Sequence, residues 1–218
     1  MNLLLAYTTA LLVGSVHALD ADHMAAVTAF AVRRPHWREA AGFGLRWALG
    51  HGAAVVLVGA GILLIGVRFP DGTDALLERL VGFVLIGLGA WTVWSARRIH
   101  AHEHVHGDGT PHVHLHSHAF VRSHDHRHGA TAVGVLHGLA GSAPAVALVP
   151  VASFDSAGQG IVYLLLFAVG TAAGMALYAM LAGLVIGRAA VRSERLARGL
   201  GIATGCITMA VGAVWLIR

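Results

Sequence analysis

Four ionisable side chains lie within seven residues of an apolar stretch near the start of the chain: His17, Asp20, Asp22 and His23. The segments on either side of this cluster carry no charged residue. On an uninterrupted helix, at about 100° per residue, His17, Asp20 and His23 share an arc of about 120° and Asp22 points roughly the opposite way. Two imidazoles and a carboxylate on one face suit a borderline divalent cation such as nickel, cobalt or zinc.

Asp22 has two roles open to it. It can join the ligand set if the helix unwinds there, or it can accept an imidazole N–H and orient that ring. The competing interpretation of the cluster is a buried His–Asp pair that locks two helices together. Ionisable groups inside apolar segments are costly and commonly functional, so the sequence favours metal binding.

Two further histidines lie in apolar segments. His51, in the stretch WALGHGAAVV, is flanked by glycines that leave space beside it; the alternative is a hydrogen-bonded histidine of the core. His137 lies in the second half of the chain, where no carboxylates or second histidine follow it. It either adds a ligand or lines an exit path. The predicted metal site comprises His17, Asp20, Asp22, His23, His51 and His137.

The composition is that of a membrane protein. Of the 218 residues, 56% are hydrophobic and 12% charged, about half the charged fraction of a soluble domain. The 28 glycines fit transmembrane helices, which pack through small residues. The single cysteine, Cys206, excludes a disulfide framework within one chain and a multi-thiolate metal site. We expect Cys206 to be a small buried hydrophobe.

Six segments are apolar enough to cross a bilayer, which takes roughly 20 residues: about 3–32, 39–66, 75–96, 131–153, 158–187 and 199–217. The first is long and is expected to break or kink near the polar cluster. It lacks the basic start of a signal peptide, so we interpret it as a retained first helix.

A histidine-rich segment separates the third and fourth spans. Eleven of the sixteen histidines lie there: His100, His102, His104, His106, His112, His114, His116, His118, His124, His126 and His128. The segment has too little apolar content for a core and is predicted to be a flexible loop. It would bind divalent metals weakly at several sites, with affinity falling below about pH 6 as the imidazoles protonate. The alternative is a plain linker.

Arginines cluster in alternate connections, which sets the predicted orientation. The basic connections contain Arg33, Arg34 and Arg38; Arg97, Arg98, Arg122 and Arg127; and Arg188, Arg192, Arg195 and Arg198. Both termini are therefore predicted outside and the histidine-rich loop in the cytoplasm, in an inner membrane. Because the arginines lie between apolar runs, we attribute them to topology and expect no nucleic-acid partner.

The chain also contains an internal repeat. GSVHALDADH, which begins at Gly14, resembles GVLHGLAGSA, which begins 120 residues later at Gly134 (134 − 14); the same offset relates His17 to His137. Three spans per half is an odd number, so the halves must enter the membrane in opposite directions. The predicted fold class is an all-α membrane protein of two inverted three-helix repeats, residues 1–96 and 131–218, joined by the loop 97–130.

These motifs resemble those of the nickel/cobalt transporter (NiCoT) family. The stretch from His17 to His23 is similar to its His-x4-Asp-His signature, and Leu49-Gly50-His51-Gly52 is similar to its second-helix motif. The stretch from His137 to Ala143 resembles a branch of urease-accessory, nickel-permease-like membrane proteins. The resemblance implies that the matching residues select and pass nickel or cobalt. Uptake members are larger and have a further acidic motif that is missing here, and the loop resembles that of efflux members.

The sequence thus predicts a permease for nickel, or cobalt, and not an enzyme. Uptake is slightly favoured over efflux, and the metal is cargo, with no resident cofactor. The expected partners are the divalent ion, the lipid bilayer and a cytoplasmic metallochaperone. The alternatives are a zinc transporter, a membrane store that delivers nickel to a metalloenzyme, and a membrane metalloenzyme. The His-Glu-x-x-His motif of a metalloprotease is absent from the sequence.

Overall fold

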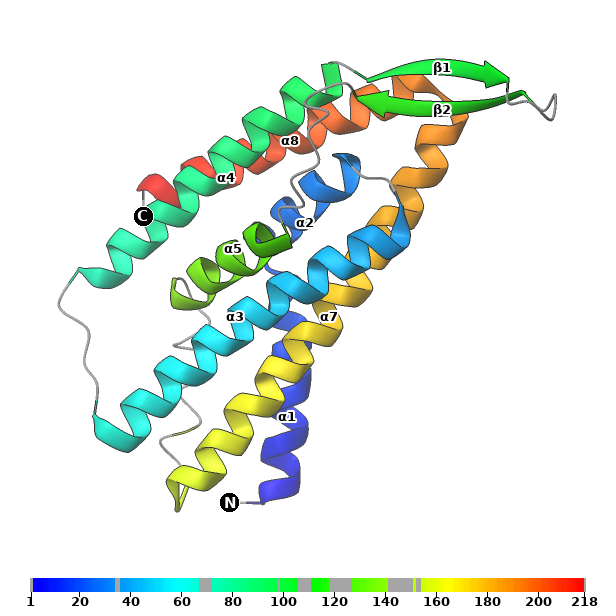
Figure 1. Cartoon of the computed structure of the whole chain (residues 1–218). Helices are drawn as coiled ribbons and strands as arrows, with labels where there is room; N and C mark the ends of the chain where they lie inside the picture. The colour runs from blue at the N-terminus through cyan, green and yellow to red at the C-terminus, as the bar shows by residue number, and fades with distance from the viewer. Residues whose placement is uncertain are drawn as a thin grey trace.

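The computed structural model describes residues 2–33, 36–66, 72–97, 99–105, 111–117, 127–140, 151 and 154–217. These residues form a bundle of helices with a small hairpin at one end (Figure 1). The helices are α1 (Leu3–His17), α2 (Ala21–Arg33), α3 (Trp37–Ile65), α4 (Thr73–Arg97), α5 (Arg127–Leu139), α7 (Ala157–Arg192) and α8 (Glu194–Ile217). The hairpin consists of β1 (Ile99–Val105) and β2 (Pro111–Ser117).

The described helices confirm a multi-pass membrane protein. Four of them (α3, α4, α7 and α8) are long and apolar enough to cross a bilayer, and α1 with α2 makes a fifth span if this bent pair is counted as one. These five correspond to five of the six predicted spans. The remaining one, 131–153, is represented by the short apolar helix α5; residues 141–150 lie outside the described part.

The first span is broken at the polar cluster. The backbone N–H groups of Leu19 and Asp20 donate to carbonyls three residues back, at 2.9 and 3.0 Å, which is the tighter 3₁₀ pattern that ends an α-helix. The Asp20 carbonyl then accepts from Met24 at 2.9 Å and starts α2, which is bent by 55° from α1. The break was expected, but the arc drawn for an uninterrupted helix is wrong because the helix ends at His17.

The bundle packs through glycines in a swapped pattern. A Cβ on Gly14 of α1 would overlap the Phe167 carbonyl of α7, and a Cβ on Gly134 of α5 would overlap the Trp47 carbonyl of α3. The two glycines are 120 residues apart in the sequence (134 − 14), and so are the two residues whose carbonyls they face (167 − 47). Hence α1 packs on α7 as α5 packs on α3, and each half lends its first helix to the other half.

The same swap appears in the reverse direction. A Cβ on Gly50 of α3 would overlap the Thr131 carbonyl of α5, and a Cβ on Gly170 of α7 would overlap the Leu11 carbonyl of α1. Backbones that approach this closely require glycine and let neighbouring helices pack tightly within a membrane. Gly50 thus holds α3 against α5, and Gly52 holds it against Ala168 of α7, on either side of His51.

The remaining pair, α4 and α8, packs along its own glycines. Gly82 faces Gly212, and Gly89 faces Gly205. Figure 1 shows this pair on the far side of α2 and α5 from α3 and α7. Cys206 on α8 is exposed, so the expectation that it is buried is wrong: it lies beside Gly205, which takes the position of closest approach to α4.

The histidine-rich segment contains a hairpin where an irregular loop was predicted. β1 and β2 pair antiparallel, with His100 opposite His116, His102 opposite His114 and His104 opposite His112. Alternation of histidine with a second residue has the two-residue period of a strand, and the intervening sequence HGDGT has turn composition. Figure 1 shows the hairpin at the end of the bundle opposite the N-terminus.

Candidate metal centre

Three histidines from three helices meet in the interior. His17 is the last residue of α1, His23 lies in the first turn of α2, and His51 lies within α3. One ligand nitrogen of each lies within 4.8 Å of the others, and the ring centroids are 4.9 to 5.3 Å apart. The three residues are 0 to 6% exposed. The bend between α1 and α2 is what turns His23 toward His17.

Two carboxylates fix the rings of this cluster. Asp20 Oδ2 accepts a hydrogen bond from His17 Nδ1 at 2.9 Å, and Asp22 Oδ1 accepts one from His23 Nδ1 at 3.0 Å. An ionised carboxylate only accepts, so both imidazoles carry their proton on Nδ1 and leave Nε2 with a bare lone pair. Asp22 also accepts from the His23 backbone N–H at 2.9 Å, which matches the orienting role considered for it.

His137 and His51 complete the ring of imidazoles. His137 Nδ1 donates to the Val133 carbonyl at 3.2 Å, so its Nε2 is also bare, and its ring lies 5.6 Å from that of His23. His137 is not one of the three residues whose ligand atoms lie within 4.8 Å. Both nitrogens of His51 are buried, with no hydrogen-bond partner among the described residues.

The chemistry of the cluster follows from these bare nitrogens. Within the described part of the chain, Nε2 of His17, His23, His51 and His137 is buried without a hydrogen-bond partner. Nε2 of His17, His23 and His137 is a buried acceptor without a donor, whereas neutral His51 carries its proton on one of two unpaired nitrogens. Buried acceptors in this state are unfavourable unless a cation joins them. Ligand nitrogens about 2.1 Å from a tetrahedral ion would lie roughly 3.4 Å apart. To hold one ion, the three ligand nitrogens must therefore move closer together by at most about 1.4 Å (4.8 − 3.4).

Asp20 and Asp22 differ in exposure. The Asp20 side chain is 43% exposed and the Asp22 side chain 10%, so Asp20 lies at an opening of the site and Asp22 inside it. Asp20, Asp22 and His23 form a second group whose ligand atoms lie within 4.8 Å. The ligand roles of all six residues stay predictions.

Two aromatic walls of the site were not predicted. The Trp47 ring lies 5.0 Å from that of His137 and 6.0 Å from that of His23, and the Phe167 ring lies 5.5 Å from that of His17. Both side chains are fully buried. The repeat could have identified them, because Trp47 and Phe167 are related by its offset of 120 residues (167 − 47).

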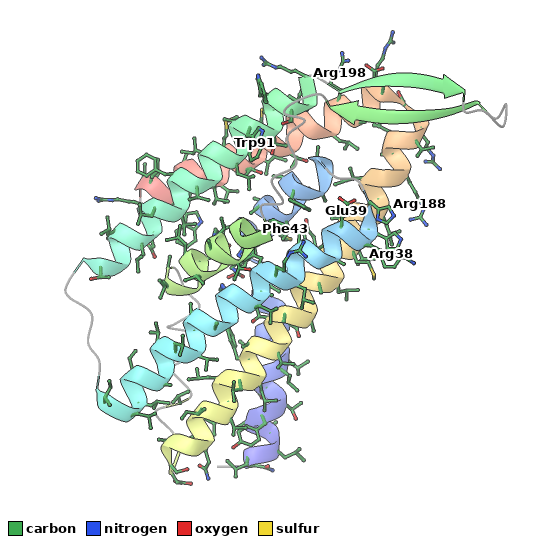
Figure 2. All side chains as sticks on the ribbon, viewed as in Figure 1. Arg38, Glu39, Phe43, Trp91, Arg188 and Arg198 are labelled. Carbon is green, nitrogen blue, oxygen red and sulfur yellow. The ribbon has the colours of Figure 1, made fainter. Side chains whose placement is uncertain are left out.

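Trp47 is in turn held by aromatic packing. The ring of Phe43, labelled in Figure 2, lies 5.7 Å from that of Trp47 and stacks on Phe30 of α2 at 3.8 Å.

The repeat offset of 120 residues also relates His51 to Thr171, whose hydroxyl donates to the Phe167 carbonyl of its own helix. The walls are therefore symmetric, but the ligands are not: the first half supplies three of the four imidazoles.

The loop histidines lie apart from this site along the chain. His100, His102 and His104 are on β1, and His112, His114 and His116 are on β2. His128 belongs to α5. The remaining four, His106, His118, His124 and His126, lie outside the described residues.

Loss of the Asp22 carboxylate should weaken metal binding. An Asp22→Asn side chain can present its NH₂ group to His23 Nδ1 and so move the ring proton to Nε2, the metal-facing atom. Loss of such an orienting partner typically lowers affinity about 10- to 100-fold. Isothermal titration of purified Asp22→Asn with Ni²⁺ measures this loss. Asp155→Asn, at an exposed acid before α7, is the control; equal affinities in the two variants would contradict the orienting role.

Comparison with known proteins gives both a family and relatives. Residues 6–207 match the family described as cytochrome C biogenesis protein transmembrane region. Urease accessory protein UreH of Bacillus sp. (strain TB-90) is 28% identical over 185 residues, which cover 84% of this chain and 78% of UreH. Chloroplast protein FOR GROWTH AND FERTILITY 1 of Arabidopsis thaliana is 29% identical over 179 residues, which cover 80% of this chain and 48% of the plant protein. No solved structure matches.

These descriptions name a transmembrane region and an accessory to an enzyme. They confirm the expectation that this chain is not itself an enzyme, and they agree with a membrane protein of a nickel-related group. The family match extends over 202 of the 218 residues (207 − 6 + 1). The chain therefore belongs to the family of the cytochrome C biogenesis protein transmembrane region.

Proposed function

We propose that this protein is an inner-membrane permease that carries Ni²⁺, with Co²⁺ as a second cargo. The ion is held by His17, His23 and His51, with His137 facing it from the second half of the chain and Asp20 at the entrance. One observation carries the proposal: buried imidazoles from three helices bring ligand nitrogens within 4.8 Å of one another, and Nε2 of each has no hydrogen-bond partner among the described residues. Imidazole suits nickel and zinc alike, so geometry must supply the selectivity.

The relatives support the choice of nickel. UreH is named as an accessory of urease, which is a nickel enzyme, and the motifs at His17 and His51 resemble those of the NiCoT family. The matched family's name instead refers to cytochrome c biogenesis.

The glycine contacts support six spans in two inverted repeats. In our proposal α1 with α2 forms the broken first span and α5 begins the fourth. The swapped contacts of Gly14 and Gly134 are what a two-fold axis between α3 and α7 would produce. Transporters of this plan hold their cargo near the midplane, where helices are broken; here His17 and His23 flank such a break.

Metal flux through sealed proteoliposomes tests the proposal. Ni²⁺, Co²⁺ and Zn²⁺ are supplied in turn on either side, with a metal-sensitive dye in the opposite compartment. A permease for nickel moves Ni²⁺ faster than Zn²⁺, and the faster direction separates uptake, which we favour, from efflux. A membrane store binds nickel without moving it. Flux no higher than in empty vesicles, from protein that binds nickel, would reject the permease in favour of that store.

The proposed topology has both termini outside and the hairpin in the cytoplasm. We expect a cysteine at Ser117, on β2, to be labelled only from the cytoplasmic side, and one at Ser156, before α7, only from outside. The physical reason is that short arginine-rich connections stay in the cytoplasm. A membrane-impermeant maleimide applied to cells and to inverted vesicles measures this, with Cys206 replaced first. Labelling of Ser117→Cys from outside would reverse the orientation.

The loop is proposed to deliver or collect metal without choosing it. A Gly/Ser linker of equal length in place of residues 102–126 should leave the order of preference among nickel, cobalt and zinc unchanged. The reason is that a tethered chelator only raises the local metal concentration, to the order of millimolar. The wild type should bind several more nickel ions than this variant at neutral pH. A changed preference in the flux assay would make the loop part of the selectivity site.

A further inference from the structure

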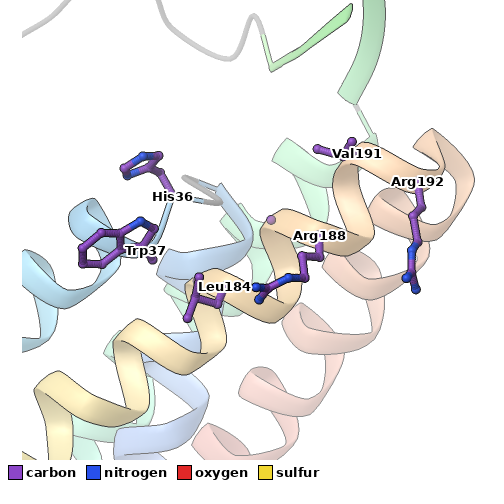
Figure 3. A pocket seen from close by; sticks show the side chains of 8 residues that line it. His36, Trp37, Leu184, Arg188, Val191 and Arg192 are labelled. Carbon is purple, nitrogen blue, oxygen red and sulfur yellow. The ribbon is translucent and has the colours of Figure 1, made fainter.

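A groove lies at the hairpin end of the bundle, away from the imidazoles of the candidate metal centre. It is a groove of about 550 Å³ between the start of α3 and the end of α7, and His36, Trp37, Gly183, Leu184, Gly187, Arg188, Val191 and Arg192 line it. Figure 3 shows His36 and Trp37 on one side and the α7 side chains from Leu184 to Arg192 along the other.

The charge of this groove is one-sided. Arg188 and Arg192 are exposed and lie one turn apart on α7, a like-charge spacing that is unfavourable on a helix. Throughout the residues that the structure describes, neither arginine has an ion-pair partner. Figure 2 labels Arg38 and Glu39 at the start of α3 and Arg188 towards the end of α7. Arg38 stacks on the Trp37 ring at 5.0 Å, so a third cation lies beside the two arginines that line the groove.

Apart from His36, the rest of the lining is apolar or glycine. Trp37 is 39% exposed and Val191 87% exposed, and Gly183 packs closely against Trp37 and Ala40, where α7 meets the start of α3. Below the groove, Leu181 and Val185 of the same helix are exposed at 49% and 65%, on a helix long enough to span the bilayer. From the end of α7 inward, the residues are first arginines, then a tryptophan of the neighbouring helix, then apolar side chains. This order is typical of the boundary between the lipid headgroups and the acyl chains of a bilayer.

We propose that this groove binds an anionic phospholipid of the adjoining leaflet. Arg188 and Arg192 hold the phosphate through their N–H groups, a geometry that guanidinium suits, and Trp37 packs against the glycerol region. The acyl chains follow Leu184, Leu181 and Val185 down α7. Basic residues near a membrane surface attract anionic lipids in this manner. The binding does not depend on the metal cargo.

Lipid retention in nanodiscs tests the proposal. The full-length protein is reconstituted in phosphatidylcholine with increasing phosphatidylglycerol, and native mass spectrometry counts the lipids that stay bound. The wild type should retain phosphatidylglycerol preferentially, by on the order of tenfold. The double variant Arg188→Gln/Arg192→Gln should lose this preference. Arg79→Gln/Arg195→Gln, with the same change in charge away from the groove, should keep it.

Other outcomes decide against the proposal. Equal retention of the two lipids by the wild type would overturn it, as would equal loss of preference in the two double variants. Inorganic phosphate added in excess should not displace the lipid; complete displacement would identify a site for a free anion instead. If the glutamine variant does not fold, Arg188→Lys/Arg192→Lys decides: it keeps the charge and should keep most of the preference, and its failure to do so would contradict the proposal.

Discussion

Proteoliposomes that contain His23→Ala are expected to move nickel no faster than vesicles without protein. His23 is 2% exposed, and its ring is within 4.9 to 5.6 Å of the rings of His17, His51 and His137. Its loss removes the imidazole that contacts all the others and leaves Asp22 without its partner. Loss of an orienting carboxylate alone typically costs about 10- to 100-fold in affinity, so loss of the ligand should cost more. Initial rates of Ni²⁺ entry measure the effect.

The same vesicles separate a metal site from a structural one. His23→Ala should elute as a single species on size exclusion with the helical content of the wild type, because alanine suits the first turn of α2. His17→Ala should behave alike. Asp155→Asn is the matched control and should transport normally. Wild-type flux in either histidine variant would exclude the cluster as the transport site, whereas a variant that does not insert would favour the His–Asp pair that locks helices together.

The membrane class and five of the six predicted spans could be read from the sequence. Apolar segments of spanning length are a local property, and so is the cost of placing His17, Asp22 and His23 inside one of them. The cluster of histidines was predictable for the same reason. The sequence placed His51 in one site with His17, and the rings of these two residues lie 5.3 Å apart.

The detailed geometry of the site could not be read in the same way. The end of α1 at His17 depends on 3₁₀ bonds at Leu19 and Asp20, and neither glycine nor proline marks this break in the sequence. An uninterrupted helix would have pointed Asp22 away from the ligands, whereas the break brings it onto His23. Trp47 and Phe167 become walls only because α3 and α7 cross, which is a tertiary feature.

The hairpin is a feature whose signal was present in the sequence, although a loop was predicted there. Composition identified residues 100–128 as poor in apolar side chains, and a loop was inferred from this alone. The alternating histidines of β1 and β2 also have strand periodicity, and their register places three histidine pairs directly opposite one another. Hydrophobic content predicts whether a segment forms a core, but the pairing of two adjacent segments depends on the turn between them.

Alanine at Gly14 or at Gly134 is expected to prevent stable assembly of the bundle, with similar losses in the two halves. Each added Cβ would overlap a backbone carbonyl, that of Phe167 or that of Trp47, and a carbonyl within a helix cannot rotate away. Overpacking of this kind typically costs about 1–3 kcal/mol and more where backbone must move. The unfolding temperature in detergent, followed by loss of helical circular dichroism, measures each loss.

Gly87→Ala and Gly199→Ala are the controls for this comparison. No described atom lies within 4 Å of a Cβ at either position, and alanine favours a helix by about 1 kcal/mol over glycine, so both variants should be as stable as the wild type or slightly more so. The strength of the test lies in the pairing of Gly14 with Gly134. Two halves that exchange their first helices across a two-fold axis must suffer equally from the same change. A chain that tolerates alanine at Gly134 but not at Gly14 would therefore not pack as two equivalent repeats, and the imidazoles at α1, α2 and α3 would then form a site that belongs to the first half alone.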